Sequence, residues 1–115
     1  MEYDKTTKKC IEDCSKCYEE CIKTIAHCLK MGGEHASSEH IGVLMDCAEA
    51  CKISQNLMLR MSPNSAEFCE ECAEVCDKCA ESCDAIGKED AQMKECAKIC
   101  RECAASCREM EAAQD

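Results

Sequence analysis

The spacing of its cysteines constrains this chain more than any other sequence feature. Cysteine makes up 16 of the 115 residues, and the unit C-x3-C-x2-C-x3-C occurs three times, at Cys10–Cys21, Cys72–Cys83 and Cys96–Cys107. Residues three or four positions apart lie on one face of an α-helix. The spacing therefore predicts helices with one face lined by sulfur, and no segment alternates with the period of two expected of a strand.

A fourth, degenerate copy of the unit lies between the first and second complete copies. It keeps Cys47 and Cys51 but has Ser54 and Met58 at the last two positions. At about 100° per residue, the cysteines of each helix fall within an arc of roughly 60–80°. Charged residues occupy the opposite arc, so we expect each cysteine face to point into the protein interior.

The content of large apolar residues is too low for an ordinary aliphatic core. Leu, Ile, Val and Phe together number 14 in 115 residues, below the roughly 20% under which a charged chain is expected to be disordered. Either the chain is unfolded or cysteine fills the core. Thiols alone would leave a core underfilled, which favours a core that also holds metal.

Three breaks divide the chain into four helical segments. They are the Gly32-Gly33 pair, the turn sequence at 62–64, and Gly87, which we expect as the C′ residue of the third helix. Asn64 and Glu67 have the spacing of a capping box. The predicted helices cover about 4–31, 37 or 38 to 61, 64 or 65 to 86, and 88–111. Short loops between helices of this length predict an all-α, antiparallel four-helix bundle with a cysteine-lined core, forming a single domain over residues 1–115.

The net charge and the N-terminal sequence indicate which classes of partner and which cellular compartment to expect. The net charge of −10 and the absence of Trp argue against nucleic-acid binding. No stretch approaches the roughly 18 apolar residues of a membrane span, and the N-terminus has no secretory signal pattern. We therefore expect a cytoplasmic protein with reduced thiols, in which clustered cysteine binds metal rather than forming disulfides.

The helical spacing favours Cu(I) over other thiolate-binding metals. Cβ atoms at i and i+4 lie about 6 Å apart, which suits a soft ion held between two thiolates. Zinc prefers four tetrahedral ligands, and iron–sulfur clusters need loops that wrap around them. CxxC pairs such as Cys14/Cys17 instead lie within uninterrupted helical segments. A zinc or mixed-metal thiolate buffer and an iron–sulfur or redox carrier remain as alternatives.

The sequence resembles the bacterial copper storage proteins, and in particular their cytosolic branch. The resemblance rests on the helical CxxxC pairs at Cys10/Cys14, Cys47/Cys51 and Cys96/Cys100, and on the segment His27–Met31. It implies a cysteine-lined bundle that stores many Cu(I) ions along its axis in the cytosol, with no catalytic activity. It also implies a homotetramer, for which the apolar face of the second helix could provide an interface.

We expect all of the cysteines to be Cu(I) ligands: Cys10, Cys14, Cys17, Cys21, Cys28, Cys47, Cys51, Cys69, Cys72, Cys76, Cys79, Cys83, Cys96, Cys100, Cys103 and Cys107. His27, Met31 and His40 lie near one end of the predicted bundle and are further candidate ligands. With Met93 they could pass Cu(I) inward by ligand exchange. The alternative is that these side chains only fill and solvate the bundle end. The sequence offers no candidate catalytic residue.

Overall fold

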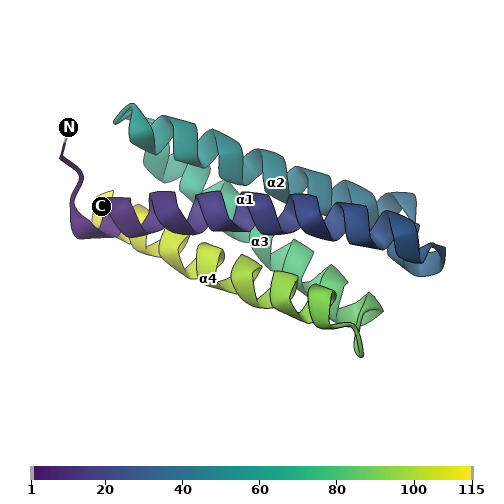
Figure 1. Cartoon of the computed structure of the whole chain (residues 1–115). Helices are drawn as coiled ribbons and strands as arrows, with labels where there is room; N and C mark the ends of the chain where they lie inside the picture. The colour runs from purple at the N-terminus through teal and green to yellow at the C-terminus, as the bar shows by residue number, and fades with distance from the viewer. Residues whose placement is uncertain (1, 115) are drawn as a thin grey trace.

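The computed structural model describes residues 2–114 and consists of four long helices joined by short turns (Figure 1). No strand occurs in this range, which confirms the predicted all-α class. The helices are α1 (Lys5–Met31), α2 (Ser38–Leu59), α3 (Ser65–Ile86) and α4 (Ala91–Gln114), with a 3₁₀ turn, η1 (Gly33–Ala36), between the first two.

The helices form an antiparallel bundle measuring 44 × 19 × 19 Å. Helices α1 and α3 each pack against both α2 and α4. The two chain termini and the α2–α3 turn lie at one end of the bundle, while the α1–α2 and α3–α4 turns lie at the other (Figure 1). We call the first the terminal end. The second is called the His end, because His27, His35 and His40 lie there.

The ends of α1 and the start of α2 follow from local capping. The Asp4 carboxylate accepts a hydrogen bond from the backbone N–H of Thr7 at 2.8 Å and begins α1. Gly32 ends the helix with a φ of 72°, a conformation that favours glycine. The Ser37 hydroxyl oxygen accepts from the backbone N–H of His40 at 3.2 Å, as expected of an N-cap.

The α2–α3 turn differs from the prediction in two respects. Helix α2 ends at Leu59 rather than Met61, because Met61 adopts a left-handed conformation with a φ of 54°. The predicted capping box is wrong, because the Asn64 side chain makes no capping hydrogen bond. The Ser65 hydroxyl instead donates to the carbonyl oxygen of Ser62 at 2.9 Å and closes the turn.

The α3–α4 turn also corrects the sequence prediction. Helix α4 begins at Ala91 rather than Lys88, because an Asp90 carboxylate oxygen accepts from the Met93 N–H at 3.1 Å and caps the helix there. The helix also extends past residue 111, to Gln114. Gly87 ends α3 as predicted, but its φ of −107° is not left-handed. Glycine is needed because a Cβ at this position would overlap the side chain of Met93.

Cysteine fills the core, as the composition predicted. All sixteen cysteines have an exposed fraction of 0%. Among the described residues, Leu44 and Ile99 are the only buried members of the Leu, Ile, Val and Phe group. The remaining buried apolar side chains are alanines and methionines, which pack around the sulfur atoms. The bundle therefore holds its helices together around thiols rather than around aliphatic side chains.

Two glycine substitutions test this packing. We expect Gly87→Ala to destabilise the reduced protein by about 1–3 kcal/mol, because the added methyl overlaps Met93. Gly42→Ala is the matched control, since a Cβ there has nothing within 4 Å and lies inside α2. The control should stabilise by about 0.5–1 kcal/mol. Urea unfolding followed by circular dichroism measures both, and equal effects would contradict the packing of Gly87.

Candidate metal centre

The sixteen cysteines form a group of buried sulfur atoms along the bundle axis, which we call the thiol array. All of them are free thiols, as expected. Each helix contributes its cysteine face, and most of the short S···S contacts join different helices. Cys47 Sγ lies 3.6 Å from Cys76 Sγ, and Cys103 Sγ lies 3.7 Å from Cys14 Sγ. Sulfur atoms far apart in sequence therefore lie within reach of a single small ion.

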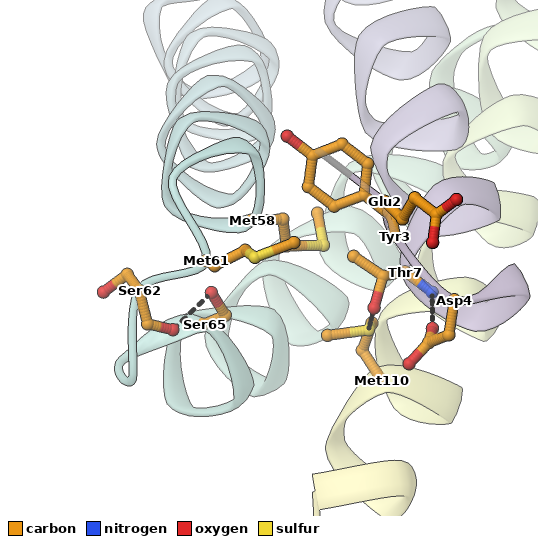
Figure 2. Close-up of a pocket in the computed structure, with 9 residues that line it drawn as sticks. All are labelled: Glu2, Tyr3, Asp4, Thr7, Met58, Met61, Ser62, Ser65 and Met110. Atoms are coloured by element: carbon orange, nitrogen blue, oxygen red, sulfur yellow. Dashed lines mark hydrogen bonds between the residues drawn. The ribbon is translucent and has the colours of Figure 1, made fainter.

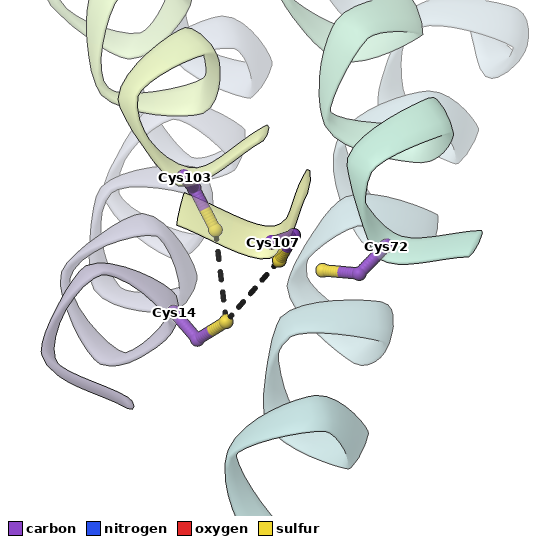
Figure 3. Close-up of side chains that lie close together, drawn as sticks. All are labelled: Cys14, Cys72, Cys103 and Cys107. Carbon is purple, nitrogen blue, oxygen red and sulfur yellow. Dashed lines mark hydrogen bonds between the residues drawn. The ribbon is translucent and has the colours of Figure 1, made fainter. Parts of the chain in front are cut away.

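Several groups of four sulfurs lie close enough to share an ion. In Figure 3, Cys14, Cys72, Cys103 and Cys107 converge from three helices, and their sulfurs all lie within 4.8 Å of one another. Other such groups along the array include Cys51/Cys72/Cys76/Cys103, Cys17/Cys47/Cys51/Cys76, Cys17/Cys21/Cys47/Cys100 and Cys21/Cys79/Cys96/Cys100. These groups offer soft, buried, anionic ligands once their protons are removed.

Neighbouring groups in this series have two sulfurs in common. The group in Figure 3 has Cys72 and Cys103 in common with the next, which in turn has Cys51 and Cys76 in common with the third. The same overlap continues to the last group. Separate tetrahedral sites would each need their own four ligands. The overlap instead favours bridging thiolates and an ion that accepts low coordination numbers.

The pKa values of the buried thiols are shifted in both directions. Burial raises the pKa of Cys28 to about 11. Hydrogen bonding with neighbours such as Cys17 raises the pKa of Cys100. Hydrogen bonds from neighbours, Cys100 foremost, lower the pKa of Cys47, because S–H groups stabilise its thiolate. Since only the thiolate binds metal, loading must release protons.

Methionine sulfurs extend the thiol array at both ends. At the His end, Met93 Sδ lies 3.5 Å from Cys28 Sγ, and at the terminal end Met58 Sδ lies 3.9 Å from Cys69 Sγ. The sequence pattern pointed to both methionines, because each continues a cysteine face. Thr24 interrupts the cysteine face of α1, and its hydroxyl donates to the Glu20 carbonyl oxygen at 2.8 Å.

The His end contains a histidine pair that is held by one carboxylate. Asp90 Oδ2 lies 2.7 Å from Nε2 of His27 and 3.0 Å from Nε2 of His35. Burial opposes ionisation of Asp90, but the hydrogen bonds from His27, the Met93 backbone and His35 bring its pKa down to about 2. Sequence reasoning did not single out Asp90, although its position three residues before Met93 has N-cap spacing.

The three candidate ligands outside the cysteines occupy different environments. His40 is buried, with an exposed fraction of 1%, and its Nδ1 lies 2.7 Å from the Ser82 hydroxyl. Its Nε2 has no hydrogen-bond partner in the structure, and burial lowers its pKa, which favours the neutral imidazole that binds metal. Met31, by contrast, is 55% exposed on the surface. It lines a surface pocket together with His27 and His35.

The sequence profile of the copper storage proteins matches residues 3–112. The chain belongs to the copper storage protein family. Copper storage, with multiple Cu(I) ions as the cargo, is accordingly its function, and the thiol array provides the soft ligands that such ions require. The family is one of storage proteins rather than enzymes.

Solved structures of similar sequence have the same bundle. A protein of Nitrosospira multiformis is 41% identical, with a TM-score of 0.88, and the match covers 96% of this chain and 99% of that one. The Cu(I)-bound copper storage protein BsCsp3, from Bacillus subtilis, is 33% identical over 93% of this chain and 99% of its own, with a TM-score of 0.83. A Streptomyces lividans copper storage protein loaded with 10 copper equivalents is 25% identical over 93% of this chain and 84% of its own, with a TM-score of 0.81.

No curated protein sequence matches the chain. Within the described residues, none of the helices combines the length and apolar character needed to span a bilayer.

Proposed function

We propose that this copper storage protein holds Cu(I) as a continuous thiolate array to which all sixteen cysteines contribute. The overlap of the four-sulfur groups carries the proposal, since each group has two sulfurs in common with the next. A thiolate can bridge two Cu(I) ions, and each ion can take two thiolates. Ions can therefore fill the bundle axis as one chain, with residues 1–115 acting as a single storage domain.

His27, Met31 and His40 are proposed as ligands that pass Cu(I) into the array at the His end. The unpartnered Nε2 of buried His40 supports this role. His27 would have to exchange its hydrogen bond with Asp90 for the ion. The exposed Met31 thioether is available to an incoming ion without any rearrangement. Copper would then move from Met31 to His27 and His40, and on to Cys28.

We further propose a cytosolic homotetramer without catalytic activity. Cytosolic storage agrees with the reduced state of the array, because thiols persist in a reducing compartment. One S. lividans relative is described as a cytosolic copper storage protein. Exposed apolar side chains on α2, among them Met45, Ile53 and Leu59, support an interface between copies of the chain.

Anaerobic metal titration tests the choice of metal. Cu(I) added to the reduced protein should produce ultraviolet thiolate charge-transfer bands without visible colour, and it should displace any bound zinc. A Cys47→Ser/Cys51→Ser variant should show weaker bands, whereas a half-buried Ser15→Ala control on α1 should match the wild type. Zinc that resists displacement by Cu(I) would favour the zinc buffer, and visible colour with iron and sulfide would favour the redox carrier.

A further inference from the structure

A pocket at the terminal end is lined by methionine and lies at the opposite end of the bundle from the histidines. Its volume is about 260 Å³, and Met58, Met61 and Met110 contribute to its walls. In Figure 2 these three side chains converge on it from α2, the α2–α3 turn and α4, while Tyr3 lies across the pocket. Three of the seven methionines in the sequence therefore gather at one opening.

The inner wall of this pocket touches the thiol array. Met58 is 1% exposed and its Sδ lies 3.9 Å from Cys69 Sγ. Cys69 in turn contacts the thiols of Cys10 and Cys107. The sulfur atoms of Cys10 and Cys107 lie 3.8 Å apart, at the end of the array. An ion in the pocket could therefore exchange with the array without crossing an apolar barrier.

The positions of the Met58 and Met110 sulfurs are set by specific features of the chain. The Thr7 hydroxyl donates to Met110 Sδ at 3.3 Å, which orients a thioether that is only 3% exposed. Met58 occupies the last position of the degenerate cysteine unit in α2, where the complete copies have cysteine. An apolar plug would close the pocket, but here Glu2 and Asp4 lie in its wall beside the thioethers, and their negative charge favours a cation.

Thioether ligands would make this site chemically different from the array. A thioether is neutral and carries no proton, so it binds and releases Cu(I) without proton transfer. A cysteine must lose its proton to bind and regain one on release. An ion held partly by methionine is therefore easier to remove than an ion bridged by thiolates.

We propose that Met58, Met110 and Cys69 form a labile Cu(I) site at the terminal end, through which copper leaves the array to an external thiol or chelator. The inference rests on the proposed storage of Cu(I) by the array. On binding, Cu(I) forms bonds to two thioether sulfurs and to Cys69 Sγ, and the Cys69 proton passes to solvent. On release, the external ligand takes the ion and Cys69 regains a proton. Copper remains Cu(I) throughout.

Methyl NMR of the full chain tests the site directly. With ¹³C-methyl methionine and stepwise anaerobic Cu(I), the resonances of Met58 and Met110 should shift, while that of Met45, 49% exposed on α2, should not. The single variants Met58→Leu and Met110→Leu assign the signals. Unchanged Met58 and Met110 resonances up to saturation would overturn the proposal and leave these residues as core packing.

Extraction kinetics test the release role. A Met58→Leu/Met110→Leu variant keeps apolar volume, and we expect a strong Cu(I) chelator to remove copper from it about tenfold more slowly than from wild type. Ile22→Leu, at an exposed position on α1, is the control and should match wild type. Equal rates in all three would refute the release role. In the same samples, the ultraviolet thiolate bands measure Cu(I) binding by the thiol array. If these bands do not develop, the proposed storage of Cu(I) by the array is contradicted.

Discussion

We expect saturation of the reduced chain with Cu(I) to raise its melting temperature by at least about 15 °C. The metal-free core contains few large aliphatic side chains, and its sixteen buried thiols contribute little apolar volume. A ligand that binds only the folded state stabilises it by about 4 kcal/mol at a thousand times its Kd. For a domain of roughly this size, each kcal/mol shifts the melting temperature by about 4–8 °C, so one well-occupied site already accounts for the expected shift.

Circular dichroism melts under anaerobic conditions, with and without copper, measure this effect. The Cys47→Ser/Cys51→Ser variant is a useful comparison, because both thiols belong to the central part of the array. Its copper-induced gain should be smaller than that of wild type. Identical melting temperatures for metal-free and loaded wild type would mean that the thiol core is already well packed, and that copper does not act as a structural ligand.

We expect full loading to take up about one Cu(I) per cysteine, on the order of sixteen ions per chain, and to release about one proton for each ion. The stoichiometry follows from sulfurs that belong to two groups at once, such as Cys51 and Cys103. The proton count follows because only the thiolate binds Cu(I), so each thiol that joins the array must lose its proton. Because each thiolate charge is balanced by one Cu(I), the core stays near neutral and avoids the cost of buried charge.

Competition against a strong Cu(I) chelator gives the ion count, and a pH indicator in weak buffer gives the protons. Because protons compete with the metal for thiolates, the apparent affinity should fall as the pH is lowered. Zinc added under the same conditions serves as the control for a metal that needs four ligands. Saturation at about four ions, or tight binding without proton release, would indicate isolated four-thiolate sites and favour the zinc alternative.

Local chemistry explains why much of the fold could be predicted. Steps of three and four residues put the cysteines of each helix on one face, and turn residues such as Gly32 mark where a helix must end. Errors arose where a tertiary contact decided the outcome. Helix α4 starts at Ala91 because Asp90 caps it and also binds two histidines. Gly87 is required by the side chain of Met93 rather than by its own backbone conformation.

The sequence by itself determined that sulfur faces the interior of four antiparallel helices, because the helical period assigns each cysteine to a face and the charged residues occupy the other. Only the tertiary structure decided which sulfurs meet, as in Cys47 with Cys76 and Cys14 with Cys103. It also separated buried His40 from exposed Met31. The physical reason is that periodicity defines the direction of a side chain around its own helix, whereas the axial offset between helices depends on how all four pack together.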